Sequence, residues 1–347
     1  MKYKSDFDVY KRLGEPEKEE KSQIWKTAIG LQQVDGLQPS KYLIQTAIEN
    51  IEGEINFYEV KERINSYYKS KPLQSQNDRS EEADKVSARI AEILSEKTFT
   101  FNPLQYIEIH KRLFDDIYDF AGTIRDYNVL KDEWVLDGAS VYYASTNAIM
   151  KTMNYDFAIE KEFNYQGLSV EQVIDHIAKF TSDIWQVHAF GEGNTRTTAV
   201  FIIKYLETLG FHVTNDLFAQ HSWYFRNALV RANYNDYPNN VYSTLKYLNN
   251  FFANLLVGKD IPLKNREMHI KATSTNVPIN VPINVPINRK EEILNYLSIN
   301  PNATINELAI KFSVNDKTIK RDLSFLKEEK RIKRVGSNKS GYWKIIE

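Results

Sequence analysis

Apolar residues recur at three- and four-residue spacing along most of the chain, which is the period of an amphipathic helix. The pattern is clear in SEEADKVSARIAEILSEK, NPLQYIEIHKRLFDDIYDFAG, SVEQVIDHIAKFTSDIWQ and RTTAVFIIKYLETLG. Several of these stretches begin at Ser, Thr or Asn, and some stop at glycine, as at Gly122 and Gly210. Such residues are typical helix caps. The pattern therefore predicts a mainly α protein.

One segment departs from this period. Residues 124–145, IRDYNVLKDEWVLDGASVYYAS, alternate between apolar and polar positions, and Asp137-Gly138 lies between two runs rich in Val, Tyr and Trp. Alternation interrupted by Asp-Gly is typical of a β-hairpin. We therefore predict a single β-hairpin within the helical region.

Two polar stretches divide the chain. Residues 274–288, STNVPINVPINVPIN, repeat Asn-Val-Pro-Ile, and proline at every fourth position excludes both helix and central strand, so we expect an extended linker. Residues 70–85 form a looser polar stretch. These boundaries predict an N-terminal helical segment (1–84), a main helical domain (85–270), a linker (271–288) and a C-terminal domain (289–347).

The C-terminal domain has the pattern of a winged helix-turn-helix. RKEEILNYLSIN, TINELAIKF and DKTIKRDLSFLKEE read as three helices, and RIKRVGSNKSGYWKII reads as a hairpin wing. Ile319, Leu323 and Leu326 would form the buried face of the third helix. Four residues are then left to face a DNA major groove, namely Lys317, Thr318, Lys320 and Arg321. Winged helices also serve as protein-interaction modules, so both kinds of partner stay open.

Charge is distributed unevenly along the chain. The net charge is −1, but residues 289–347 hold 13 Lys and Arg against 8 Asp and Glu, and the remaining residues hold 32 against 38. A basic C-terminal domain on an acidic body suggests an anionic partner, for which DNA is the candidate. Because a net charge of +5 supports only a few phosphate contacts, useful affinity for DNA calls for a homodimer.

The composition indicates which cellular compartment to expect for this protein. The chain of 347 residues has no cysteine, which excludes disulfides and cysteine zinc sites and suits a reducing cytosol. The N-terminus, MKYKSDFDVYKR, lacks the apolar core of a signal peptide, and no apolar run is long enough to cross a bilayer. We expect a cytoplasmic protein without a membrane partner.

Residues 188–198, HAFGEGNTRTT, directly precede a long apolar stretch, and we expect a helix to begin near Thr195 or Arg196 and to run to Leu209. The free N–H groups at the start of that helix would form an anion cradle. Gly193 would let a phosphate approach the backbone closely, and Arg196 would clamp its oxygens.

The remaining residues of the motif supply chemistry. Glu192 is a suitable ligand for Mg²⁺, His188 could act as general base towards a hydroxyl, and Phe190 would point inward and anchor the loop. Together these residues predict phosphoryl or nucleotidyl transfer. The alternative is that His188 lies at the edge of the core and that Glu-Gly-Asn-Thr only caps a helix.

HAFGEGNTR resembles the Fic motif, H-x-F-x-[DE]-G-N-G-R-x-x-R, and the resemblance covers roughly residues 85–260. It implies a mainly helical Fic domain whose hairpin is a flap that docks the target protein. It also implies transfer of AMP from ATP, with Mg²⁺, to a Ser, Thr or Tyr hydroxyl. His188 would be the base and Glu192 the metal ligand. The implied nucleotide contacts are Phe190, Gly191, Glu192, Gly193, Asn194, Thr195, Arg196, Val141, Tyr142, Tyr143, Ala144, Tyr224 and Asn233.

The sequence departs from the Fic motif in three places. Ala189 replaces the common proline, Thr195 replaces the second glycine, and Ala199 stands where the second arginine is usual. That arginine normally holds the terminal phosphates and pairs with an inhibitory glutamate. Its absence leaves two alternatives open, namely the same fold removing AMP or using another nucleotide donor, and a transcription regulator that senses a nucleotide.

The N-terminal segment resembles the small antitoxins that block Fic toxins, through AIGLQQVDGLQPS (28–40) and EGEINFYEVKERI (52–64). Their inhibitory helix carries S-x-x-x-E-G, where this chain has Leu31 followed by Asp35-Gly36. Glu52 is a second inhibitory candidate. Because the usual arginine is missing from the motif, we expect this segment to pack beside the site and inhibit differently. The alternative is that residues 20–70 are structural helices.

Overall fold

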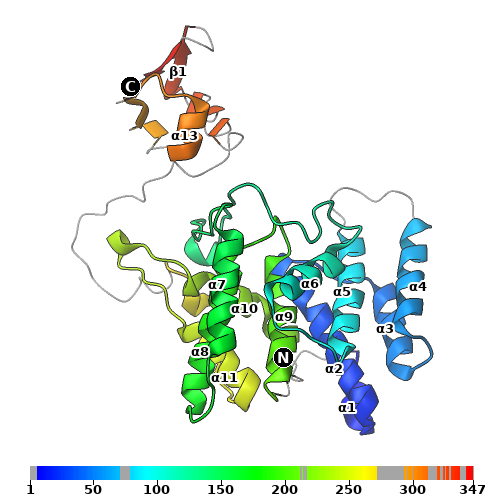
Figure 1. Ribbon diagram of the computed structural model, residues 1–347. Helices are drawn as coiled ribbons and strands as arrows, with labels where there is room; N and C mark the ends of the chain where they lie inside the picture. Colours follow the sequence, from blue (N-terminus) through cyan, green and yellow to red (C-terminus); the bar gives the residue numbers. More distant parts are fainter. Residues whose placement is uncertain are drawn as a thin grey trace. The chain divides into compact units, whose positions relative to one another are not determined.

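The computed structural model describes residues 6–70, 79–211, 213 and 217–271, together with part of the C-terminal domain. In that domain the described residues are 293–294, 296–298, 300–311, 319–320, 323–324, 326–327, 330–336 and 341–346. The predicted Asn-Val-Pro-Ile repeat and residues 71–78 of the polar stretch at 70–85 lie outside the described residues. Figure 1 shows the elements in chain order.

The N-terminal segment is helical, as its periodicity predicts. Its elements are α1 (Asp8–Leu13), α2 (Pro16–Gly30), the 3-10 helix η1 (Leu31–Asp35), α3 (Lys41–Glu52) and α4 (Phe57–Lys69). Polar caps fix two of the helix starts: the Ser40 side chain accepts the N–H of Leu43, and Asn56 and Glu59 form a reciprocal capping box. Gly36, with φ of 70°, ends η1, so that Asp35 lies at the last position of a short turn.

The main helical region surrounds helix α9, which is buried over most of its length. Its α-helices are α5 (Ser80–Ser95), α6 (Pro103–Phe114), α7 (Ile149–Glu162), α8 (Val170–Val187), α9 (Asn194–Thr208), α10 (Leu217–Ala232) and α11 (Lys246–Val257). The region also contains three short 3-10 helices, η2 (Trp134–Leu136), η3 (Tyr237–Asn239) and η4 (Asn265–Met268). Every residue from Asn194 to Leu206 is buried, which is typical of a helix packed on all sides.

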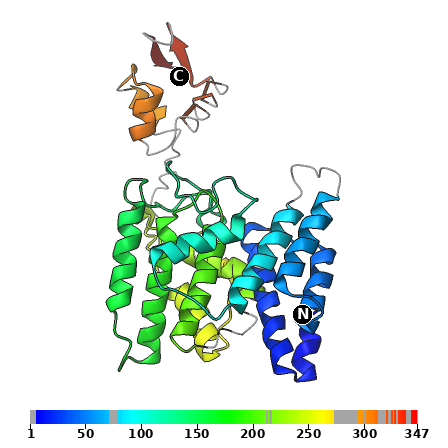
Figure 2. The same cartoon turned by 45° about the vertical axis from the view of Figure 1, so that its right-hand side comes forward.

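The N-terminal helices and the main region share a core. A single hydrophobic cluster runs from Phe7 to Met268, and α2 packs against both α5 and α10. The packing on α10 is so close that a Cβ atom built on Gly30 would lie 2.2 Å from the Ala219 Cα atom, so glycine is required there. Figure 2 shows the N-terminal helices, in blue, side by side with α5 in cyan.

The β-hairpin predicted for residues 124–145 is wrong: all of these residues are described, and none lies in a strand. Asp137 and Gly138 do form the expected turn, both with positive φ, and the Glu133 N–H donates to the Ala139 carbonyl at 3.0 Å. Val135 and Leu136 are adjacent, yet both are buried in η2. A strand would point them to opposite faces. We refer to residues 124–145 as the flap.

The C-terminal domain has its own small hydrophobic cluster. It contains α13 (Ile305–Lys311) and an antiparallel pair of strands, β1 (Ile332–Val335) and β2 (Tyr342–Ile345), which confirms the predicted wing. Ile319, Leu323 and Leu326 are buried, as predicted for the third helix. Of the four candidate DNA-binding residues, Lys320 is helical and exposed; Lys317, Thr318 and Arg321 lie outside the described residues.

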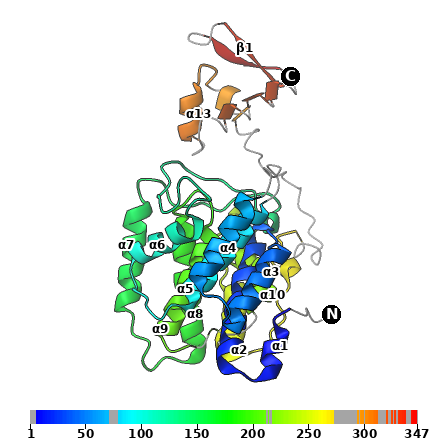
Figure 3. The same cartoon turned by 90° about the vertical axis from the view of Figure 1, so that its right-hand side faces the viewer.

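In the part of the chain that the structure describes, no helix combines the length and the apolar character needed to cross a bilayer. Figure 3 shows the helices of the N-terminal segment and main region from the side.

Candidate active site

The predicted motif lies in a short turn between α8 and α9. His188 caps the C-terminus of α8 in the left-handed region, with φ of 49°, and Gly193 caps the N-terminus of α9 with φ of 80°. A Cβ atom on Gly193 would lie 2.3 Å from the Phe114 ring. Position 193 therefore requires glycine for its backbone conformation and for its contact with α6. Helix α9 begins at Asn194, one residue before the predicted start.

Side chains of the motif hold the turn together. The Phe190 N–H donates to Asn194 Oδ1 at 3.0 Å, and Asn194 Nδ2 donates to the Phe190 carbonyl at 2.8 Å. Phe190 points inward, as expected, and its ring stacks on His110 with centroids 3.7 Å apart. Asn194, predicted as a phosphate contact, thus has its amide engaged within the loop.

His110 supports the turn from α6. Its Nδ1 atom accepts the Gly122 N–H at 2.9 Å, so its Nε2 atom carries the proton and donates to the Glu192 carbonyl at 3.0 Å. Burial, opposed only in part by that hydrogen bond, lowers the pKa of His110 to about 4. Nothing in the local sequence indicates this role, since a lone histidine on an amphipathic helix is by default a satisfied core or surface residue.

The lowered pKa of His110 makes stability depend on pH. An unfolded histidine takes up a proton near pH 6.5, whereas the folded one resists protonation down to about pH 4. Stability from this group is therefore complete above pH 6.5 and falls as the pH drops from 6.5 towards 4. We expect a loss of up to about 3 kcal/mol across that window. Urea unfolding at several pH values would measure it, and the His110→Gln variant should lack this part of the dependence.

His188 is a buried and neutral imidazole. Its side chain is 3% exposed, and neither ring nitrogen has a hydrogen-bond partner among the residues that the structure describes. Burial, followed by the positive charges of Lys131, Arg125 and Arg226, lowers its pKa well below 6.5. A neutral imidazole with an unoccupied nitrogen can accept a proton, as a general base must. Tyr143 of the flap packs on the ring, with centroids 4.0 Å apart.

Arg125 connects the flap to the motif. Its Nε atom donates to the His188 carbonyl at 2.6 Å, its backbone N–H donates to the Ala189 carbonyl at 3.0 Å, and its Nη2 atom donates to the Ala144 carbonyl. This arginine was not among the predicted site residues. Within the sequence it stands 63 positions from His188, and nothing in the local pattern reveals the contact.

Glu192 has an accessible carboxylate beside the start of α9. Its side chain is 51% exposed and pairs with Lys131 at 3.0 Å. Among the described residues no group of three or more His, Asp or Glu side chains is arranged to hold a metal ion. A Mg²⁺ ion at Glu192 would thus take its other ligands from water and from phosphate oxygens, which is the usual habit of this ion. The residues present fit such an ion.

Arg196 is buried, and both of its Nη atoms have acidic or polar partners. It is 1% exposed, and its Nη2 atom lies 2.8 Å from both Asp35 Oδ2 and Glu82 Oε1. Its Nη1 atom donates to Gln32 Oε1 at 3.0 Å, and the guanidinium lies over the Phe114 ring. Two of these partners come from η1, so in this conformation the N-terminal segment occupies the predicted phosphate clamp.

The contact with Arg196 corrects one expectation about Asp35. The sequence suggested that this aspartate lacks an arginine partner in the motif; in the structure it pairs with the motif's first arginine instead of the missing second one. Glu52, the other candidate, pairs with Lys18 at 2.8 Å and is bonded to Tyr10. The structure brings Asp35 to the motif and places Glu52 with α1 and α2.

Two of the three departures from the motif, Thr195 and Ala199, have structural explanations. The Thr195 hydroxyl accepts the indole N–H of Trp185 at 3.0 Å, so it satisfies a buried donor that glycine would leave unpaired. Ala199 is completely buried, and its small side chain suits a helix packed on every face.

The other residues predicted to contact the nucleotide lie in different parts of the main helical region. In the flap, Val141 is buried, Tyr142 is 80% exposed, and the Tyr142 carbonyl accepts a hydrogen bond from Gln186. Tyr224 is buried and bonded to Asn250 of α11. Asn233 donates to Ser182 Oγ at 2.9 Å and lines a separate cavity of about 350 Å³. The structure thus gives Tyr224 and Asn233 partners outside the motif.

Comparison with protein families gives two matches. Residues 100–206 match the Fic/DOC family, and residues 289–336 match the DeoR-like helix-turn-helix domain. The chain is also similar to "Protein adenylyltransferase VbhT" of Bartonella schoenbuchensis (strain DSM 13525 / NCTC 13165 / R1), with 27% identity over 109 residues. That alignment covers 31% of this chain and 22% of the relative's length.

Solved structures give further likenesses. The N-terminal FIC domain of Bep8 from Bartonella sp. 1-1C aligns with a TM-score of 0.36 and 19% identity, covering 64% of this chain and 88% of that one. A Fic family protein from Desulfovibrio desulfuricans G20 aligns with a TM-score of 0.43 and 11% identity, covering 97% of this chain and 90% of that one. The sequence matches place a Fic domain and a helix-turn-helix domain in this chain.

Proposed function

Because residues 100–206 form a Fic domain, we propose that the chain is an adenylyltransferase that moves AMP from ATP to a Ser, Thr or Tyr hydroxyl of a target protein. The observation that carries the proposal is His188, a neutral imidazole without hydrogen-bond partners at the turn into α9. Such a base is needed for transfer to a hydroxyl and is unnecessary for a helix cap.

In the proposed reaction, His188 accepts the proton of the target hydroxyl through a ring nitrogen. The hydroxyl oxygen then forms a bond to the α-phosphorus of ATP, and the bond between that phosphorus and the β-bridging oxygen breaks. Pyrophosphate leaves with the electron pair. The backbone N–H groups in the first turn of α9 would stabilise the phosphate charge. Mg²⁺ bound at Glu192 would supply further neutralisation of that charge.

We also propose that the resting enzyme is held inactive through Arg196. Its guanidinium already has Asp35, Glu82 and Gln32 as partners, and within the described part of the chain its Nε atom lacks one. An arginine with these contacts has little capacity left for a nucleotide phosphate. Binding of ATP in the predicted mode would require Asp35 to withdraw.

Intact-mass analysis of the full-length protein after incubation with ATP and Mg²⁺ tests the proposed reaction. We expect self-modification, seen as addition of one AMP, that depends on His188 and increases in Asp35→Ala. If neither the wild-type protein nor Asp35→Ala gains mass although ATP binding is measured separately, the results would favour removal of AMP, another nucleotide donor or a nucleotide-sensing role. A panel of nucleotide donors and adenylylated proteins would then separate these alternatives.

The DeoR-like match supports a second activity, DNA binding by the C-terminal domain. In this proposal, a nucleotide bound to the Fic domain would change the affinity of the C-terminal domain for DNA. Lys320 is exposed, whereas Ile319 and Leu323 of the same predicted helix are buried. Its charge is therefore available to a DNA phosphate. A protein-interaction role for this domain remains the alternative.

Lys320→Ala is expected to weaken binding to all duplexes and to reduce the slope of log K against log salt by about 1. Fluorescence anisotropy with a random-sequence duplex over a salt series measures both. Lys97→Ala, at a highly exposed lysine of the main region, is the control and should change neither. Absence of duplex binding at low salt would favour a protein partner.

A further inference from the structure

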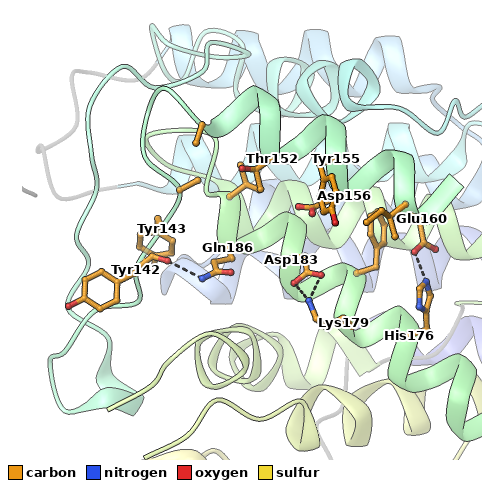
Figure 4. Close-up of a pocket in the computed structure, with 15 residues that line it drawn as sticks. Tyr142, Tyr143, Thr152, Tyr155, Asp156, Glu160, His176, Lys179, Asp183 and Gln186 are labelled. Carbon is orange, nitrogen blue, oxygen red and sulfur yellow. Dashed lines mark hydrogen bonds and ion pairs between the residues drawn. The ribbon is translucent and has the colours of Figure 1, made fainter. Parts of the chain in front are cut away.

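A groove outside the motif runs along α7 and α8. Its volume is about 590 Å³, and it is lined by residues of the flap, α7 and α8. Figure 4 shows Asp156 of α7 and Asp183 of α8 near its middle, with Tyr142 and Tyr143 at one end and Glu160 and His176 at the other.

The helical repeat explains the shape of the groove. Its α7 side is formed by Ala148, Thr152, Asp156 and Ile159, which are spaced at three or four residues and therefore share a face. From Ala148 to Ile159 the helix rises about 16 Å. That length matches about five residues of an extended chain. The groove is therefore suited to a peptide segment.

Carboxylates supply the charge of the groove. Asp183 is paired with Lys179, and Glu160 is bonded to His176 and to two tyrosine hydroxyls. Asp156 differs, because its Oδ2 atom is buried and has no hydrogen-bond partner. Burial, followed by the charge of Asp183, raises the pKa of Asp156 to about 6. Asp156 itself is half-buried, so a cation entering the groove could contact its carboxylate and stabilise the charged form.

Apolar side chains flank these charges. Tyr155 and Ile159 line the groove and are also exposed, at 64% and 48%. An aliphatic stem that ends in a positive charge would cover such a surface and reach Asp156. Lysine and arginine have that form, and a nucleotide, with its phosphate charge, does not.

The groove adjoins the candidate base. Tyr143 lines its flap end and also packs on the His188 ring, and Val187, the residue before His188, is part of the lining. A chain lying in the groove would thus continue towards the imidazole that is proposed to accept the hydroxyl proton.

We propose that this groove binds an extended segment of the target protein in which a lysine or arginine, paired with Asp156, lies a few residues from the modified hydroxyl. This inference rests on the proposed function, because it assigns the groove to the target of that reaction. It predicts that basic segments are preferred and that acidic ones are disfavoured by Asp156, which lacks the partners that Asp183 and Glu160 have.

Synthetic peptides test the preference without requiring catalysis. Each would carry one Ser, Thr or Tyr and, at one flanking position at a time, Lys, Ala or Glu, with a fluorescent label for anisotropy on the full-length protein. At the best position we expect lysine to bind at least about tenfold more tightly than alanine, which corresponds to one charge-assisted contact. Asp156→Asn should remove the higher affinity for the lysine peptide. Asp156→Lys should make the glutamate peptide bind more tightly than the alanine peptide.

Glu162→Gln is the matched control, since it removes one charge from the same helix outside the groove lining, and it should leave the lysine advantage intact. Thermal melting of each variant would establish that it is folded. If peptides show no lysine preference, or keep that preference in Asp156→Asn, the groove does not have this role. Selective binding without any nucleotide transfer would preserve the groove assignment and overturn the proposed reaction instead.

Discussion

Replacing His188 with alanine is expected to lower the rate of nucleotide transfer by about 10²–10⁴-fold, the usual contribution of a general base. Nucleotide affinity should stay nearly unchanged, because the base acts on the attacking hydroxyl and not on ATP. Single-turnover transfer, followed by mass spectrometry, and calorimetric titration with ATP measure the two quantities separately. His269→Ala, outside the motif, is the control for loss of a histidine.

The pH dependence of the wild-type rate offers a second check on His188. Its pKa is lowered by burial and by neighbouring cations, so the imidazole remains neutral as the pH falls through 6.5. The acidic decline of the rate should therefore begin well below pH 6.5. If His188→Ala loses ATP binding along with transfer, its assignment as base is wrong and a role in shaping the nucleotide site would replace it.

Replacing Asp35 with alanine is expected to raise the affinity for ATP by about 10–100-fold. Removing one partner of a buried ion pair typically costs 3–5 kcal/mol, and here Glu82 and Gln32 would retain part of the interaction with Arg196. In the variant, a phosphate of ATP could take the place of the Asp35 carboxylate as a partner of the Arg196 guanidinium. Titration with ATP and single-turnover transfer rates would show the gain, and thermal melting would show a lower stability without nucleotide.

Two further variants sharpen the test of the Asp35 contact. Glu52→Gln removes a carboxylate from the same N-terminal segment, but its partners are Lys18 and Tyr10, so it should not alter ATP affinity. Asp35→Glu keeps the charge and should remain close to wild type. Unchanged or weaker ATP binding by Asp35→Ala would mean that the ion pair stabilises the fold without regulating access to the site.

Sequence patterns predicted the parts of this molecule that depend on local spacing. Helical periodicity located the helices that carry the motif, and Phe190 points inward as expected. The β-hairpin prediction for the flap was wrong because the apolar and polar residues that alternate along it include Val135 and Leu136, which are both buried in a 3-10 turn. Propensity over a few residues cannot reveal such a tertiary preference.

Contacts between residues that are far apart along the chain could not be predicted from the sequence. Gln32 and Arg196 are separated by 164 positions, and Glu82 and Arg196 by 114, so no spacing rule connects them. The same applies to His110 and the Glu192 carbonyl. The resemblance to Fic antitoxins pointed to Asp35, but the identity of its arginine partner emerged only from the packing of η1 against α9.

The shared core of the N-terminal helices and the main region limits how the proposed activity could be switched on. Because α2 is pressed against α10 at Gly30 and Ala219, its departure would expose a large apolar surface to water and would amount to partial unfolding. Activation would therefore cost less free energy if the signal changed only the rotamers of the Asp35 and Arg196 side chains. Such a switch would be fast and reversible, unlike the release of a separate antitoxin chain, and its strength would not depend on protein concentration.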